Sequence, residues 1–209
     1  MQWGKYYREN RSPVTYEELS PNLVNALVAT EDLRFTEHSG IDLQSMGRVA
    51  WGIIKKVVTF GASSLDGGGS TLSQQTAKNL FKTRGQNEGP LMKIPGLRML
   101  IIKTKEWIVA VKLERYYTKK EILAMYLNTA QFSGNSYGIK VAAKTFFNKP
   151  TYDLNVEEAA VLVGMLKAST YYNPARNPEN SMRRRNVVMN QMRRYGFLEQ
   201  EAYDTLAPQ

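Results

Sequence analysis

Glu31 lies on an apolar helical face, which is an unusual place for a carboxylate. Apolar side chains recur around it at intervals of four residues, at Leu23, Leu27 and Phe35, so they share one face of a helix. Withdrawing a carboxylate from water costs free energy unless the group is paired or is needed for a reaction. Glu31 is therefore a candidate general base or acid, and the open alternative is a structural ion pair with Arg34 or with another basic side chain.

A second glutamate, Glu106, repeats the pattern further along the chain. It shares a helical stripe with Ile102, Ala110 and Leu113, and Lys103 lies one turn away. The alternative is a common, weak pair between Lys103 and Glu106, three residues apart on the helix. Two embedded acids on separate helices suit glycosyl chemistry, in which one group moves a proton and the other steers charge at an oxocarbenium-like centre.

A glycine-rich segment is a candidate anion-binding site. Gly67–Gly69 lead into a helix that Ser70 or Thr71 caps, and free N–H groups and the helix dipole favour an anion at such a terminus. The segment is not a P-loop, because its lysine follows the Ser/Thr pair. The next turns carry amides and amines that suit sugar hydroxyls and a diphosphate: Gln74, Gln75, Lys78, Asn79 and Lys82. The alternative is a flexible loop beside an ordinary solvated helix face.

The spacing of apolar residues predicts helices nearly throughout, and no stretch alternates apolar and polar residues long enough to indicate a sheet. The predicted helices cover about 21–35, 43–60, 71–82, 97–117, 139–147 and 180–195. Thr118 and Asn155 begin further helices, because each is followed three residues later by a glutamate that completes a capping box. Residues 83–96 are predicted to form a long loop, and 132–138 a turn-rich one.

Composition excludes several classes of protein. The 209 residues suit one domain or two small lobes, and 43% hydrophobic with 22% charged residues are ordinary globular values. Without cysteine there is no disulfide framework, thiolate metal site or cysteine nucleophile, and His38 is the one histidine. No run is long enough to span a membrane, and the first residues do not form a signal peptide.

The formal charge of +9 favours an anionic partner, which could be nucleic acid, a membrane surface or a phosphorylated substrate. Five arginines crowd one late helix and form either a solvated basic face or a nucleic-acid-binding surface: Arg183, Arg184, Arg185, Arg193 and Arg194. The helix at 43–60 combines an apolar stripe with Lys55 and Lys56 at its rim, which fits a membrane-surface helix or a buried core helix.

Five motifs, in order along the chain, resemble those of the peptidoglycan glycosyltransferase (transglycosylase) domain, glycosyltransferase family 51, of class A penicillin-binding proteins and monofunctional transglycosylases. They are ATEDLRFTEHSG, GGSTLSQQTAKNLF, KTKEWIVAVKLE, KKEILAMYLN and GNSYGIKVAAKTFFNK. The match runs from about Pro21 to Pro174. Five ordered motifs are far more specific than any one of them alone.

The resemblance implies a mainly α-helical, lysozyme-like, two-lobed fold with a head and a jaw that dips into the membrane. Residues 1–20 would be an N-terminal linker after a missing membrane segment, 21–209 the glycosyltransferase domain, and about 43–67 and 83–96 the jaw. Such an enzyme would work on the outer face of the bacterial cytoplasmic membrane. The full-length chain could also carry a transpeptidase domain, although neither Ser-x-x-Lys nor Lys-Thr-Gly occurs in these residues.

The implied reaction is the polymerisation of lipid II, an undecaprenyl-diphosphate-linked disaccharide peptide, into β-1,4-linked glycan strands with release of undecaprenyl diphosphate. Glu31 matches the catalytic general base, and Glu106 matches the second catalytic glutamate. The residues that match substrate-binding positions are Asp32, Arg34, Phe35, His38, Gly68, Gly69, Ser70, Thr71, Gln74, Gln75, Lys78, Asn79 and Lys103. Moenomycin-type phosphoglycolipids are expected to bind the donor side, and nucleic acid is not an expected partner.

We expect one inverting displacement, because a diphosphate leaves readily and cations suffice to hold its charge. The sequence requires no cofactor and has no metal-site spacing, although a divalent cation, Mg²⁺ or Mn²⁺, could bridge the diphosphate and Glu106. Two residues depart from the family pattern: Ile102 stands where a basic residue is usual, and Asn148 where a glycine is usual. The alternatives are a lysozyme-like glycan hydrolase and a basic nucleic-acid-binding module.

Overall fold

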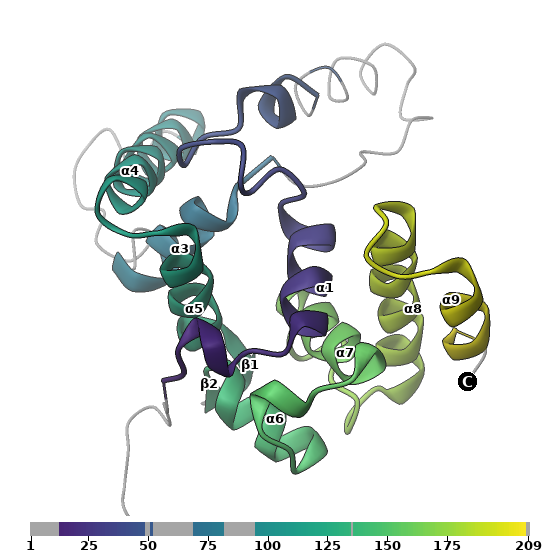
Figure 1. The fold of residues 1–209 in the computed structure, drawn as a ribbon. Helices are drawn as coiled ribbons and strands as arrows, with labels where there is room; N and C mark the ends of the chain where they lie inside the picture. Colours follow the sequence, from purple (N-terminus) through teal and green to yellow (C-terminus); the bar gives the residue numbers. More distant parts are fainter. Residues whose placement is uncertain (1–12, 49–50, 52–68, 82–94, 135, 208–209) are drawn as a thin grey trace, which may run out of the picture. The chain divides into compact units, whose positions relative to one another are not determined.

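The computed structural model describes residues 13–48, 51, 69–81, 95–134 and 136–207. This part of the chain is mainly helical, as predicted, and includes one two-stranded antiparallel hairpin (Figure 1). None of its helices combines the length and the apolar character that crossing a membrane requires. The chain divides into two compact units: a middle unit, Glu31–Tyr126, and a terminal unit that combines Met1–Thr30 with Leu127–Gln209.

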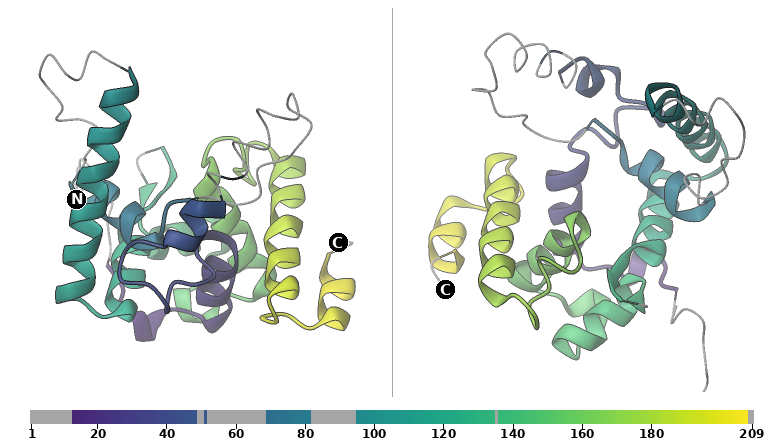
Figure 2. Two further views of the ribbon diagram at one scale, coloured as in Figure 1. Left: turned by 90° about the horizontal axis from the view of Figure 1, so that it is seen from above. Right: turned by 180° about the vertical axis from the view of Figure 1, so that it is seen from behind.

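The terminal unit contains helices and one short hairpin. Its elements are η1 (Tyr16–Glu18), α1 (Pro21–Glu31, whose last residue belongs to the middle unit), β1 (Gln131–Ser133), β2 (Ser136–Tyr137), α6 (Ile139–Phe147), η3 (Thr151–Asp153), α7 (Val156–Lys167), α8 (Pro178–Arg194) and α9 (Gln200–Leu206). The hairpin contacts α6 and α7. Helix α7 packs against α6 and α8, and α9 lies beside α8 (Figure 2). The predicted capping box at the start of α7 is confirmed, because Asn155 and Glu158 bond each other's backbone N–H groups.

The described residues before α1 are tied to the terminal unit. Val14 exchanges two hydrogen bonds with the side chain of Asn128, at 2.9 and 2.8 Å. The Ser20 hydroxyl donates to the Leu154 carbonyl at 2.8 Å. These bonds hold the chain at the entrance to α1, which ends on Glu31.

The middle unit contains the elements that carry the predicted chemistry. Residues 43–48 are helical, and α3 (Leu72–Phe81) packs along α4 (Pro95–Tyr116). Helix α5 (Lys119–Thr129, whose residues from Leu127 belong to the terminal unit) follows, and its start is capped by Thr118 and Glu121 as predicted. The stripe predicted for α4 is confirmed, because these residues are all buried: Ile102, Glu106, Ala110 and Leu113.

The structure corrects two local predictions. Helix α1 ends at Glu31 and does not continue to Phe35, because the Asp32 carbonyl accepts the Phe35 N–H in a turn while the Asp32 side chain bonds elsewhere. The segment 132–138, predicted as a turn-rich loop, contains most of the β1–β2 hairpin, whose strands are Gln131–Ser133 and Ser136–Tyr137. Its strands are only two and three residues long, too short for alternation to be visible in the sequence. The predicted jaw segments lie mostly outside the described residues.

Candidate active site

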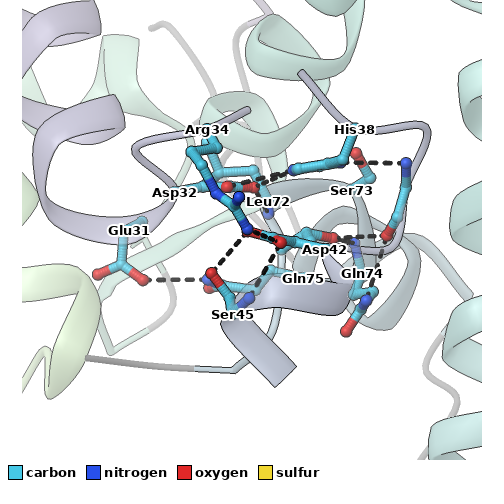
Figure 3. A network of polar contacts seen from close by, with 12 residues as sticks. Glu31, Asp32, Arg34, His38, Asp42, Ser45, Leu72, Ser73, Gln74 and Gln75 are labelled. Carbon is cyan, nitrogen blue, oxygen red and sulfur yellow. Dashed lines mark hydrogen bonds and ion pairs between the residues drawn. The ribbon is translucent and has the colours of Figure 1, made fainter. Parts of the chain in front are cut away.

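Asp32 caps helix α3 from a distant part of the chain. Its carboxylate accepts the Leu72 N–H at 2.9 Å and lies 3.0 Å from His38 Nε2 (Figure 3). A helix N-terminus favours negative charge, and here the carboxylate of the protein itself supplies it. We expected free N–H groups at this terminus to hold a substrate anion, but the Leu72 N–H is already used.

His38 is held between Asp32 and the backbone of Gly40. The Gly40 N–H donates to His38 Nδ1 at 3.2 Å, so Nδ1 is the acceptor and the proton lies on Nε2, facing Asp32. Lys119 closes this cluster, because its Nζ donates to the His38 carbonyl at 2.5 Å and lies 4.3 Å from the centre of the Phe35 ring. Asp32, Phe35 and His38, which we predicted to bind substrate, thus stabilise the loop after α1.

Two further predicted substrate-binding residues bond the backbone of Gly40. The Thr71 hydroxyl donates to the Gly40 carbonyl at 2.8 Å, and Gln74 Nε2 donates to the same oxygen at 3.1 Å. Both side chains are buried, whereas we predicted Gln74 on a face that binds sugar hydroxyls and a diphosphate. Their hydrogen bonds fix α3 against the loop that contains His38.

Arg34 pairs with Asp42 and Gln44, so the predicted alternative of an ion pair between Arg34 and Glu31 is wrong. Asp42 also caps the helix at 43–48 by accepting from the Ser45 N–H at 3.0 Å and the Ser45 hydroxyl at 2.6 Å. Burial raises the pKa of Asp42, but these bonds and the Arg34 charge outweigh burial and hold it below the ordinary value.

Glu31 ends α1 as a half-buried side chain and meets an amide of α3. Gln75 Nε2 donates to Glu31 Oε2 at 3.0 Å (Figure 3), and the Tyr126 hydroxyl donates to Gln75 Oε1 at 3.1 Å. Burial, together with the negative charge of Glu31, raises the pKa of Tyr126, so its hydroxyl keeps its proton. Sequence reasoning missed Tyr126, although a tyrosine on a buried helix face needs a hydrogen-bond partner.

A second polar group lies at the start of α3. Lys103 Nζ is 2.7 Å from Glu106 Oε2 and donates to the Ser70 hydroxyl at 2.9 Å. The predicted pair between Lys103 and Glu106 therefore forms, and Lys103 also bonds Ser70, which lies 33 positions earlier in the chain. Glu106 is only 1% exposed, whereas 27% of the Lys103 side chain is accessible. The buried acid thus holds an accessible cation in place.

The remaining predicted residues are partly accessible or undescribed. Gly69, Lys78 and Asn79 are half-buried, whereas Gly68 and Lys82 lie outside the described residues. In the part of the chain that the structure describes, no three His, Cys, Asp or Glu side chains gather as a metal site would require. Ser70 and Gln75 are five residues apart, so the groups around Glu31 and Lys103 meet on one short segment.

The late arginines are partly used inside the terminal unit. The Arg184 guanidinium lies 5.9 Å from the Tyr172 ring, and that of Arg193 lies 5.2 Å from the Tyr203 ring. Arg185 donates to the last carbonyls of α9, at Leu206 and Ala207. These contacts join helices and weaken the alternative of a nucleic-acid-binding surface.

Ile102 and Asn148 differ from the pattern of the motifs, and the structure shows how each is accommodated. Ile102 is buried on the α4 stripe. Asn148 ends α6 with φ of 54°, a left-handed conformation that glycine adopts freely and asparagine tolerates better than other residues. Asparagine can therefore replace glycine at this helix end.

Known proteins match both the sequence and the fold. A family model described as Transglycosylase matches residues 1–193. Penicillin-binding protein 1A of Aquifex aeolicus is 37% identical over 202 residues, which are 97% of this chain and 25% of that protein. Penicillin-binding protein 1F of Bacillus subtilis is 38% identical over 192 residues, or 92% of this chain and 24% of that protein. The chain thus spans about a quarter of the length of these relatives.

The crystal structure of penicillin-binding protein 1A from Haemophilus influenzae, at 2.6 Å resolution, has the same fold with a TM-score of 0.52. The two sequences are 21% identical, and the matched region is 95% of this chain and 17% of the Haemophilus influenzae chain. Together these matches confirm the mainly helical fold and the enzyme class predicted from the motifs, a peptidoglycan glycosyltransferase. The chain belongs to the transglycosylase family.

Proposed function

We propose that this domain polymerises lipid II into β-1,4-linked glycan strands, with Glu31 as the general base. The observation that carries the proposal is the setting of Glu31, a half-buried carboxylate that accepts a hydrogen bond from Gln75 of α3, while the cation Lys103 of α4 bonds Ser70, five residues before Gln75 in the chain. The acceptor 4-hydroxyl is a poor nucleophile at neutral pH, so removal of its proton during attack lowers the barrier.

The proposed step is a single displacement. The acceptor oxygen forms a bond to the anomeric carbon of the donor as its proton passes to Glu31. The bond from that carbon to the diphosphate breaks, and its electron pair leaves with the diphosphate oxygen. The configuration inverts from the α-linked donor to the β-linked product, without a covalent enzyme intermediate.

Lys103 is the proposed contact for the leaving diphosphate. It is accessible, it is positively charged, and Glu106 and Ser70 fix its position. Preorganised charge of this kind stabilises a developing anion without reorganisation during the reaction. Glu106 then acts by orienting Lys103 and is not a nucleophile. Lys78, half-buried two turns into α3, is the second proposed cation.

The substrate implies where the enzyme works and what it binds. Lipid II is anchored by its undecaprenyl chain, so the proposed place of action is the outer face of the bacterial cytoplasmic membrane. We also propose that moenomycin-type phosphoglycolipids compete with the donor lipid II, and that the full-length protein carries a transpeptidase domain.

The test is polymerisation of labelled lipid II in detergent by the parent chain, by Glu31→Gln and by Glu37→Gln. Glu37 is an exposed carboxylate six residues away and serves as the matched control. We expect Glu31→Gln to lose about 100-fold or more in rate, the contribution of a general base, and Glu37→Gln to stay near the parent rate. Equal rates for Glu31→Gln and the parent would refute the assignment, and turnover of preformed glycan without lipid diphosphate would indicate a hydrolase.

A further inference from the structure

Gln75 joins the proposed base to a buried tyrosine. Its amide nitrogen donates to Glu31 Oε2 at 3.0 Å, and its amide oxygen accepts from the Tyr126 hydroxyl at 3.1 Å. The three side chains come from α1, α3 and α5. The contact is therefore long-range in the sequence and depends on the folded middle unit.

The chemistry of the three groups allows one direction for these bonds. A carboxylate only accepts hydrogen bonds, so Glu31 requires the NH₂ end of the Gln75 amide. That leaves the amide oxygen for Tyr126, whose hydroxyl can donate. Burial raises the pKa of Tyr126, which keeps this donor protonated at any pH at which the enzyme works.

A glutamine without the tyrosine would hold the carboxylate less well. Its amide could turn by 180° about the last side-chain bond and would then present oxygen to the Glu31 carboxylate. The Tyr126 hydroxyl disfavours this flip, because a flipped amide would set an NH₂ group against a hydroxyl that otherwise donates. Gln75 is bonded at both ends, whereas its neighbour Gln74 bonds the Gly40 carbonyl and faces the interior.

We infer that Tyr126 is a positioning residue for the general base, acting through Gln75. Gln75 donates to Oε2 of Glu31, and Oε1 is the proposed acceptor of the proton from the acceptor hydroxyl. The tyrosine does not touch substrate in this role; it fixes the rotamer of Gln75 and, through it, of Glu31. The inference rests on the proposed function of Glu31.

The first experiment compares Tyr126→Phe with Tyr116→Phe in the lipid II polymerisation assay. Tyr116 is 80% exposed in the same unit, so the control removes the same hydroxyl from the surface. We expect Tyr126→Phe to lower kcat about 3- to 10-fold with little change in KM, because one hydrogen bond that orients the base is lost while the substrate contacts remain. A kcat within about twofold of the parent would overturn the inference.

A double-mutant cycle separates positioning from general destabilisation. If Tyr126 acts through Gln75, adding Tyr126→Phe to Gln75→Ala should change kcat by less than about twofold. A full additional 3- to 10-fold loss in that background would overturn the inference, because it would mean that the tyrosine acts by another route.

The second experiment does not depend on activity. The two side-chain NH₂ proton signals of Gln75, identified by their loss in Gln75→Ala, should exchange slowly with water in the parent, because the amide is hydrogen-bonded at both ends. They should shift and exchange faster with water in Tyr126→Phe but not in Tyr116→Phe. Unchanged Gln75 signals in Tyr126→Phe would overturn the inference even if Glu31→Gln is inactive. Conversely, normal turnover by Glu31→Gln would refute the proposed function while the amide signals still reported the contact.

Discussion

Replacement of Gly40 by alanine tests whether the loop after α1 must lie directly on α4. Gly40 has φ of +94°, and a Cβ atom there would lie 2.8 Å from the backbone carbon and 2.9 Å from the backbone oxygen of Ala110. Real Cβ atoms do not approach backbone atoms so closely, so the loop or α4 must move. Because both contacts are backbone atoms of a long helix, no side-chain rotation can relieve them.

The expected cost follows from two effects. The positive φ costs a residue with a Cβ about 1–2 kcal/mol, and the steric contact costs about 1–3 kcal/mol by the measure of overpacked cores. Gly40→Ala should therefore lower the free energy of unfolding by about 2–5 kcal/mol, which is a fall in Tm of about 10 °C for a chain of this size. Movement of the loop would also weaken the hydrogen bonds that Thr71 and Gln74 donate to the Gly40 carbonyl.

The assay is urea denaturation followed by circular dichroism, with Gly47→Ala as the control. Gly47 is helical, and a Cβ there meets nothing within 4 Å. This control should gain about 0.5–1 kcal/mol, because alanine loses less backbone entropy than glycine in a helix. If Gly40→Ala lies within about 0.5 kcal/mol of the parent, the usual range for harmless surface changes, then the close approach is not a constraint and the reasoning is refuted.

Two further predictions concern charges. Lys103→Gln should lower kcat/KM for lipid II about 10-fold or more, since hydrogen bonds to charged groups contribute about 1.5–3 kcal/mol. The control is Lys112→Gln, an exposed residue of the same helix, which should leave kcat/KM unchanged. Equal losses of kcat/KM in the two variants would contradict a specific role for Lys103. The pKa of Asp42 is lowered in the folded state, so its contribution to stability is present above its unfolded value of 3.8 and is lost as the pH falls below it. The urea midpoint of the parent should therefore fall more between pH 6 and pH 3 than that of Asp42→Asn, and parallel falls would show that this carboxylate contributes nothing.

Local patterns predicted most of the helices and several of the residues at which they begin. The stripe of Ile102, Ala110 and Leu113 marked the buried face of α4, and capping residues such as Asn155 marked where helices begin. Both signals act over a few residues, through helical periodicity and through backbone N–H groups that need acceptors. Buried helix faces and helix starts can therefore be predicted from the sequence alone.

The sequence did not show which residues far apart in the chain form hydrogen bonds with one another. Glu31 was correctly placed on a mostly apolar face, but its partner Gln75 is 44 residues away, and Tyr126 lies a further 51 residues along the chain. Asp32 belongs to the same motif as Glu31 but caps a helix 40 residues away. Residue spacing within a motif cannot show which of two adjacent acids is structural, because that depends on which helix each side chain reaches.

Helix α3 shows why a structural network is needed at such a site. The helix and Thr71 just before it bury polar side chains, and each makes a directional hydrogen bond: Thr71 and Gln74 with the Gly40 carbonyl, Ser73 with Glu114, and Thr76 with the Leu72 carbonyl. Apolar contacts alone would tolerate small rotations of the helix, whereas satisfied hydrogen bonds do not. Adjacent residues on a helix point about 100° apart, so the rotation that buries Gln74 determines where Gln75 points. The buried bonds of α3 therefore keep Gln75 facing Glu31, and a variant that loosens them should lose activity before it loses its helices.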